Sequence, residues 1–221
     1  MTPRQRGFGL LEALLALALG LILLAAAGQA LVSAQQAWRV QGALSRMQDD
    51  ASLAFQRLAQ DIRMTGMFGC LAPEAIEFIA PSAAQAFAQP LQISHAGDGR
   101  EVTLSLVTAD VRGAGGNPDW TLLTDCLTWA EVHPARQAGS GTTLAFPVRR
   151  QTYRFQGDGL MLSGGGMNAV LIDNVRAFRV THVVGNDGER VDLQLTLGDP
   201  VLGVERNYAL SVALRNRLPS S

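Results

Sequence analysis

Phe8 to Val32 reads FGLLEALLALALGLILLAAAGQALV, a stretch that contains one charged residue, Glu12. The part from Phe8 to Ala27 is about as long as the roughly 20 residues that an α-helix needs to cross the hydrocarbon core of a bilayer. Arg4 and Arg6 precede it in a short polar leader, and basic flanks of this kind stay in the cytoplasm. The N-terminus therefore predicts a membrane-spanning helix that starts on the cytoplasmic side.

An ordinary secretory signal peptide is the alternative, with Ala25-Ala26-Ala27 as its cleavage site. Two features argue against it. A carboxylate inside the apolar region, here Glu12, costs about 2.5 to 3.5 kcal/mol on membrane-insertion scales. The helical pattern also continues beyond the alanines, which favours a helix that is retained in the mature protein.

Gly7-Phe8-Gly9-Leu10-Leu11-Glu12 resembles the class III signal of type IV prepilins, in which a glycine, an aromatic residue and a glutamate have this spacing. The resemblance implies that prepilin peptidase removes a leader, residues 1–7, by cutting between Gly7 and Phe8. It also implies N-methylation of the new amine of Phe8. Gly9 stands where the family more often has Ser or Thr, which is a small departure because glycine is also small.

Glu12 is expected to act in subunit docking, since a carboxylate in an apolar setting is tolerable when it is paired. The free amine of Phe8 in a neighbouring subunit is the partner that the resemblance supplies. The alternative is a lone carboxylate that reaches the membrane interface by itself.

Beyond the apolar stretch, hydrophobic residues recur every three or four positions, which predicts an amphipathic continuation of the helix to about Thr65. Gly66 is expected to cap its C-terminus. We therefore expect a transmembrane or filament-core half, residues 8–28, and an amphipathic half, residues 29–66. The periodic positions are Val40, Leu44, Met47, Ala51, Phe55, Leu58 and Ile62.

After Cys70 the sequence predicts a β-rich globular head, residues 67–221. Period-two alternation at 102–107, 191–197 and 208–214 indicates strands. Turn residues at 156–159 and 185–188 predict hairpins and hence an antiparallel sheet. The fold class is therefore α+β, and the resemblance implies a type IV pilin-like arrangement in which the long N-terminal helix packs against the sheet.

The two cysteines, Cys70 and Cys126, are too far apart in sequence for a CxxC redox site and lack nearby histidines for a metal cage. A structural disulfide is expected, tying the end of the helix to the sheet in an oxidising compartment. Two buried free thiols are the alternative.

The segment 58–70, LAQDIRMTGMFGC, resembles the helix end of the PilW family of minor pilins, and the ending 212–217, VALRNR, resembles its C-terminus. Without this resemblance, Asp61 and Arg63 would be interpreted as solvated residues on the helix surface. The resemblance implies a minor pilin that helps initiate type IV pilus assembly in a complex at the filament tip. It implies a Gram-negative inner-membrane protein with a periplasmic head that later reaches the pilus and cell surface, with pilus-dependent adhesion and twitching motility as consequences. The implied partners are other minor pilins, the major pilin, the inner-membrane assembly platform, prepilin peptidase and a tip adhesin.

A minor pseudopilin of the GspJ class, from a type II secretion system, is the alternative, because it shares the leader, the helix and a β-rich head. An enzyme is not expected. His95, His133 and His182 are far apart and accompany no nucleophile motif or metal-ligand spacing, so neither a cofactor nor a metal is predicted. The 18 basic and 19 acidic residues are scattered along the chain, which argues against a nucleic-acid partner.

Overall fold

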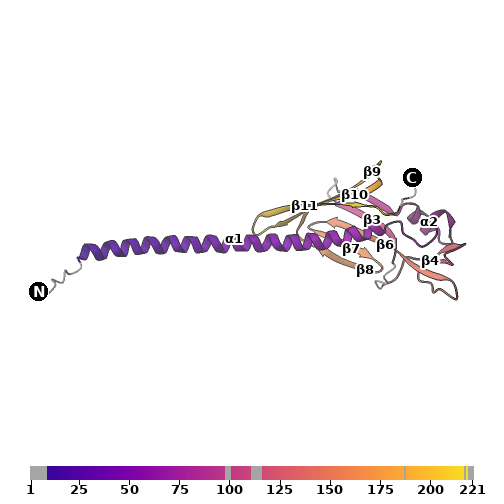
Figure 1. The fold of residues 1–221 in the computed structure, drawn as a ribbon, viewed down its shortest axis with the longest axis horizontal. Coiled ribbons are helices and arrows are strands. Elements are labelled where there is room, and N and C mark those ends of the chain that lie inside the picture. Colours follow the sequence, from indigo (N-terminus) through magenta and orange to yellow (C-terminus); the bar gives the residue numbers. More distant parts are fainter. Residues whose placement is uncertain (1–8, 98–100, 111–115, 187, 217, 219–221) are drawn as a thin grey trace. The chain divides into compact units, whose positions relative to one another are not determined.

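The computed structural model describes residues 9–97, 101–110, 116–186, 188–216 and 218. The chain divides into two compact units, the N-terminal unit, Met1–Arg46, and the head unit, Met47–Ser221. Helix α1, Leu10–Met64, has 55 residues and contributes to both (Figure 1). Its length follows from a sequence rich in Ala and Leu, both strong helix formers, with no proline between Pro3 and Pro73.

Helix α1 ends two residues before Gly66, the glycine that the sequence predicted as its cap. Gly66 has φ +77°, a left-handed conformation that suits a residue without a Cβ atom. Its N–H donates to the carbonyl of Val107 at 3.1 Å, and the side-chain amide of Asn216 donates to the carbonyl of Thr65 at 2.9 Å. The last turn is therefore tied to a strand and to the C-terminal segment.

The rest of the head unit is mostly extended (Figure 1). It also contains two short helical elements that the sequence analysis did not predict, the 3₁₀ turn η1, Pro73–Ala75, and helix α2, Pro81–Ala88. Both begin with proline, whose fixed φ suits the first helical position. The strands are β1 (Ile76–Phe78), β2 (Leu91–Ala96), β3 (Glu101–Ala109), β4 (Trp120–Thr124), β5 (Ala130–Pro134), β6 (Leu144–Gln156), β7 (Gly159–Gly164), β8 (Met167–Ile172), β9 (Val175–Gly185), β10 (Gly188–Asp199) and β11 (Val204–Ala213).

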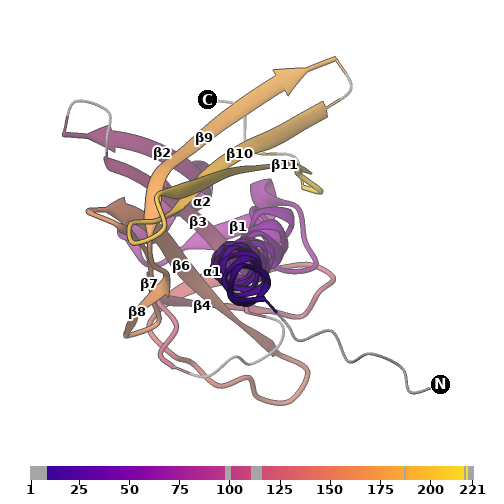
Figure 2. The ribbon, with the colours of Figure 1, turned by 90° about the vertical axis from the view of Figure 1, so that its left-hand side faces the viewer.

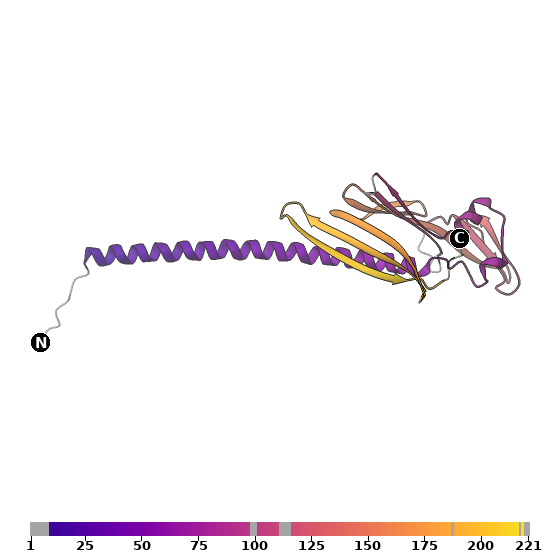
Figure 3. The same ribbon diagram turned by 90° about the horizontal axis from the view of Figure 1, so that it is seen from above.

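Within the described residues these strands form two sheets. One has eight strands, with the path β1-β5-β4-β6-β3-β2 and with β7 and β8 attached to β6. The other has the order β11-β10-β9, and its orange and yellow strands lie side by side in Figure 3. Pairing is antiparallel as predicted, except that β1 and β5 are parallel. The predicted hairpins are present as β6–β7 and β9–β10.

The part of α1 in the head unit lies between the two sheets. Figure 2, which looks along the helix axis, shows β4 and β6 on one side of this part of α1 and the β9–β11 sheet on the other. The helix buries the predicted apolar face, and alternate residues of β10 point inward while Asp192 and Gln194 point outward. The buried residues include Met47, Ala51, Ala54, Leu58 and Ile62 of α1, and Val191, Leu193, Leu195 and Leu197 of β10, whereas the predicted Val40, Leu44 and Phe55 are half-buried.

A second hydrophobic core lies under α2, next to β4 and β5. The rings of Phe68 and Phe87 stack with centroids 4.0 Å apart, and Phe87 meets Trp120 edge-on at 6.1 Å. Leu122 and Val132 complete this core from neighbouring strands. The segment just after α1 is thereby held against the eight-stranded sheet, which brings Cys70 close to β4.

Candidate assembly site and the contacts of the head unit

Glu12 lies in the first turn of α1, where the helix dipole favours a negative charge. The N–H groups of Glu12 and Ala13 donate to the carbonyl of Gly9 at 3.0 and 3.2 Å, so the helix is already formed at this position. Among the residues that the structure describes, no cation pairs with the Glu12 carboxylate. The predicted cleavage site, Gly7 and Phe8, lies outside the described residues.

The apolar residues around Glu12 have no packing partner within the described structure. From Gly9 to Arg39 every residue is exposed except Gly20, which is half-buried. Leu10 is 82% exposed and Leu23 is 71% exposed. An 18-residue window of α1 has a mean hydropathy of 2.5 and is long and apolar enough to cross a membrane. Because so large an apolar surface is unfavourable in water, this helix needs a bilayer or other apolar helices around it.

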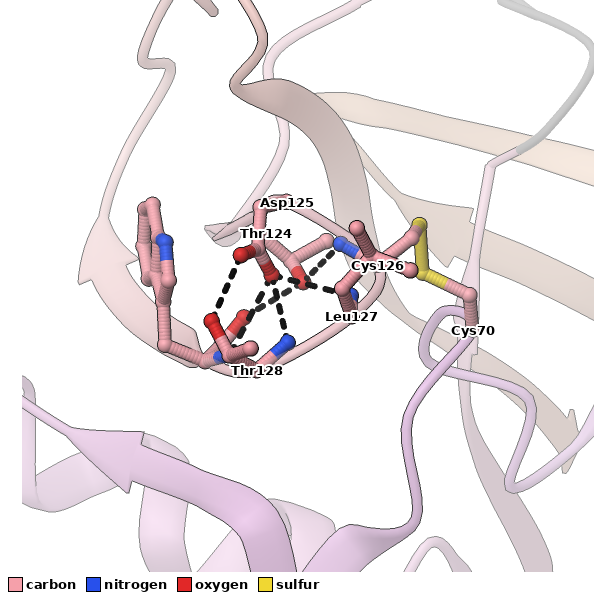
Figure 4. Close-up of a disulfide and its surroundings, with 7 residues drawn as sticks. Cys70, Thr124, Asp125, Cys126, Leu127 and Thr128 are labelled. Carbon is pink, nitrogen blue, oxygen red and sulfur yellow. Dashed lines mark hydrogen bonds between the residues drawn. A yellow bond between two sulfur atoms is a disulfide. The ribbon is translucent and has the colours of Figure 1, made fainter.

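A disulfide joins Cys70 to Cys126, as expected from the sequence, with the two Cα atoms 5.4 Å apart (Figure 4). Cys126 has φ +60°, which is uncommon for a residue other than glycine, and its N–H donates to Thr124 Oγ1 at 2.9 Å. The bridge connects the segment after α1 to the loop that follows β4.

Asp125 fixes the shape of this loop. Its carboxylate accepts hydrogen bonds from the N–H groups of Leu127, Thr128 and Trp129 and from the hydroxyl of Thr128 (Figure 4). The hydroxyl and N–H of Thr128, then the N–H of Leu127, hold the pKa of Asp125 well below its ordinary value. Leu127, at the tip, is 81% exposed. The loop therefore presents an apolar side chain from a backbone that is held in place.

The sequence analysis gave a solvated helix surface as the alternative for Asp61 and Arg63. The structure supports this alternative for Arg63, which is exposed, but not for Asp61, which is 3% exposed. The carboxylate of Asp61 accepts from Arg57 Nε at 2.9 Å and from the hydroxyl of Tyr153 at 2.6 Å. The amide nitrogen of Gln151 also donates to Asp61, and its oxygen accepts from Arg57 Nη2 at 3.2 Å.

These four residues, Arg57, Asp61, Gln151 and Tyr153, form what we call the buried clamp between α1 and β6. Burial, and then the charge of Asp61, raise the pKa of Tyr153 well above its ordinary value. Burial lowers the pKa of Arg57, but Asp61 and Tyr153 outweigh that effect, and the net pKa is raised. The clamp holds a charged group in the interior because one of its oxygens, Oδ2 of Asp61, accepts hydrogen bonds from all three partners.

A signal for the buried clamp was present in the sequence. Asp61 lies three residues after Leu58 and next to Ile62, and thus close to the apolar face of the helix. Arg57 is one turn away in α1, but the other two partners, Gln151 and Tyr153, are about 90 residues away in β6, and no local pattern connects the two segments.

The histidines do not come together into a catalytic arrangement in the described residues. His133 pairs with Glu131 at 3.1 Å, His182 pairs with Glu189 at 2.9 Å, and His95 is exposed on β2. No group of three His, Cys, Asp or Glu residues within the described part of the chain is placed to hold a metal ion.

One comparison with known proteins gives a match. A family model described as the prokaryotic N-terminal methylation motif matches residues 2–28. No curated protein and no solved structure matches the chain. The chain therefore carries a type IV pilin-like prepilin signal, which favours a structural subunit over an enzyme and indicates membrane anchoring. The match ends before the segments that resemble the PilW family.

Proposed function

We propose that the chain is a minor pilin that helps initiate assembly of a type IV pilus. The observation that carries this proposal is the methylation motif at residues 2–28, which runs without interruption into the exposed apolar part of α1. Prepilin peptidase cuts between Gly7 and Phe8 and methylates Phe8. The mature subunit then stays in the inner membrane through its helix, with the head in the periplasm, until it joins a filament.

Glu12 determines the position along the axis at which one subunit docks on its neighbour. It lies four residues from Phe8, about 6 Å along a helix, so its carboxylate can meet the free amine of Phe8 in a neighbouring subunit that is offset along the axis. Among the packed apolar helices of a filament an unpaired carboxylate is unfavourable, and pairing with the amine offsets that cost. Only the docked position supplies the pair, and the carboxylate therefore favours one arrangement of subunits over others.

The PilW-type assignment is supported by the segment 58–70 and by the ending 212–217. In this role the protein joins other minor pilins at the filament tip and contacts the major pilin, the assembly platform and a tip adhesin. Adhesion and twitching motility then depend on it indirectly. A GspJ-like minor pseudopilin of a type II secretion system has the same leader, helix and β-rich head and is the second candidate.

The first test is the mass and sequence of the mature N-terminus, measured on protein purified from membranes of a host with prepilin peptidase and signal peptidase I. We expect a chain that begins with N-methylated Phe8. A chain that begins at Gly28 would instead be a product of signal peptidase and would overturn the proposal. The matched control is Gly7→Leu, which should block the cut and leave the leader attached.

A second test separates the two filament systems. Deletion of the gene should reduce the number of surface pili and leave the secretion of type II substrates unchanged. Lost secretion with normal piliation would favour the pseudopilin.

A further inference from the structure

The exposed surface of α1 in the N-terminal unit changes character along its length. Ala13–Val32 is a run of 20 residues with no charge and one amide, Gln29. Glu12 stands immediately before this run. After a short small and polar stretch, Ser33–Ala37, come Trp38, which is 76% exposed, and the cation Arg39. Trp38 is a large apolar side chain in a part of the helix where most of the neighbouring residues are small or polar.

The length of this run matches a bilayer. Twenty residues of helix span about 30 Å, the thickness of a hydrocarbon core, and the headgroups bring the total to about 40–45 Å. When the core holds Ala13–Val32, the charge of Glu12 is at one boundary of the core. Trp38, six residues beyond the other end, is then about 9 Å further along the axis.

In this register Trp38 and Arg39 lie in the headgroup layer, which is favourable for both side chains. Side chains on a helix tilt toward its N-terminus, which brings the indole of Trp38 back toward the core and into the headgroups. Tryptophan is enriched at this depth because its ring is apolar and its N–H is a donor, and Arg39 can reach a lipid phosphate. The hydroxyl of Ser33 donates to the carbonyl of Ala30 at 2.9 Å, and this polar group therefore needs no water near the edge of the core.

We infer that Trp38 and Arg39 bind the outer lipid headgroup layer while the subunit waits in the membrane, with Glu12 at the inner boundary. The inference rests on the proposed membrane-anchored state and adds the register of insertion. A register that starts at Phe8 would place Phe8–Ala27 in the core, bury Glu12 without a partner and leave Trp38 in water. Our register avoids both costs and places only the neutral amide of Gln29 in the apolar layer.

The test is depth-dependent fluorescence quenching of the full chain in vesicles of phosphatidylethanolamine and phosphatidylglycerol. The lipids carry bromine at shallow, middle or deep positions of the acyl chain, and acrylamide is the quencher in water. Trp120 and Trp129 lie in the head unit, so the Trp38 signal is the difference between the native chain and Trp38→Phe. A calibration variant combines Trp38→Phe with Val32→Trp, which moves the probe six residues toward the membrane centre.

We expect the Trp38 signal to be quenched most by shallow bromine and to be shielded from acrylamide, and the Val32→Trp signal to be quenched more strongly by deeper bromine. Full acrylamide quenching of Trp38 without any effect of bromine, in protein that floats with the vesicles, would overturn this register and leave membrane anchoring intact. Shielding from both quenchers would place the indole against another protein chain and would also overturn the register. Protein that does not float with the vesicles would contradict both the register and the proposed function.

Discussion

The first and last stretches of α1 have the same helical backbone conformation, but the apolar side chains of the first are exposed and those of the last are buried. Leu23 in the N-terminal unit is 71% exposed, whereas Leu58 in the head unit is fully buried. The first stretch is apolar on all sides, so no single protein face can cover it, whereas the second is apolar on one side and is covered by the head. One helix therefore combines a part whose stability comes from within the chain with a part that requires surroundings from outside it.

The largest expected effect comes from a change in the exposed apolar part of α1. Glu12→Ala should abolish incorporation into filaments, because the docked amine of Phe8 loses its partner. Loss of one member of a buried ion pair costs about 3–5 kcal/mol, which is more than a hundredfold in a docking equilibrium. The measurement is the number of pili per cell by electron microscopy. Asp49→Ala, which removes an exposed carboxylate from the same helix, is the matched control and should leave pilus number unchanged.

The same variant sharpens the comparison between the two parts of α1. Glu12→Ala should unfold at the same urea concentration as the native chain in detergent, because Glu12 makes no ion pair in the described structure. Normal pilus number in Glu12→Ala would remove the register role.

The next largest effect concerns the head unit. Replacing both cysteines, Cys70→Ser with Cys126→Ser, opens a loop with a sequence separation of 56. In the chain-entropy model this lowers the free energy of unfolding by about 4 kcal/mol. Urea unfolding of the full chain in detergent measures the change, and reduction of the native disulfide provides a control without mutation. Membrane flotation should be unaffected, and a loss below about 1 kcal/mol would contradict the chain-entropy account.

A smaller effect is expected from the buried clamp. Tyr153→Phe removes a 2.6 Å hydrogen bond to the carboxylate of Asp61, and hydrogen bonds to charged groups contribute about 1.5–3 kcal/mol. Chemical denaturation should show a loss in that range. The chain offers a matched control in its other tyrosine, because Tyr208 is half-buried and Tyr208→Phe should change stability by less than about 0.5 kcal/mol. Equal losses in the two variants would mean that the hydroxyl of Tyr153 has no special role.

The sequence predicted those features that depend on local patterns. The end of α1 just before Gly66, the β6–β7 hairpin and the buried face of α1 each follow from residues that are close together in the chain. The membrane-length run and the methylation motif are local too, which explains why the class of protein could be predicted from the first 28 residues.

Features that depend on distant segments were not predictable in the same way. Alternation along β10 identifies a strand but does not say that β9–β11 form a separate sheet or that β1 pairs with β5 in parallel. The burial of Asp61 depends on Tyr153 and Gln151, which lie on another element. A polar residue near an apolar helix face can be solvated or buried, and only the distant partner decides between the two.

The smallest expected effect is a dependence on pH that should appear in the head unit through Tyr153. The pKa of Tyr153 is raised in the folded protein, whereas in the unfolded chain a tyrosine has a pKa of about 10. The folded state therefore holds the phenolic proton after the unfolded state has released it. Its stabilising contribution is complete below about pH 10 and is lost as pH rises toward the folded pKa, by up to about 1.4 kcal/mol per pH unit. Urea unfolding between about pH 9 and 11 should show this decline in the native chain and a shallower one in Tyr153→Phe. Parallel declines in both proteins would assign the alkaline destabilisation to other groups and would show that the clamp does not favour the protonated phenol.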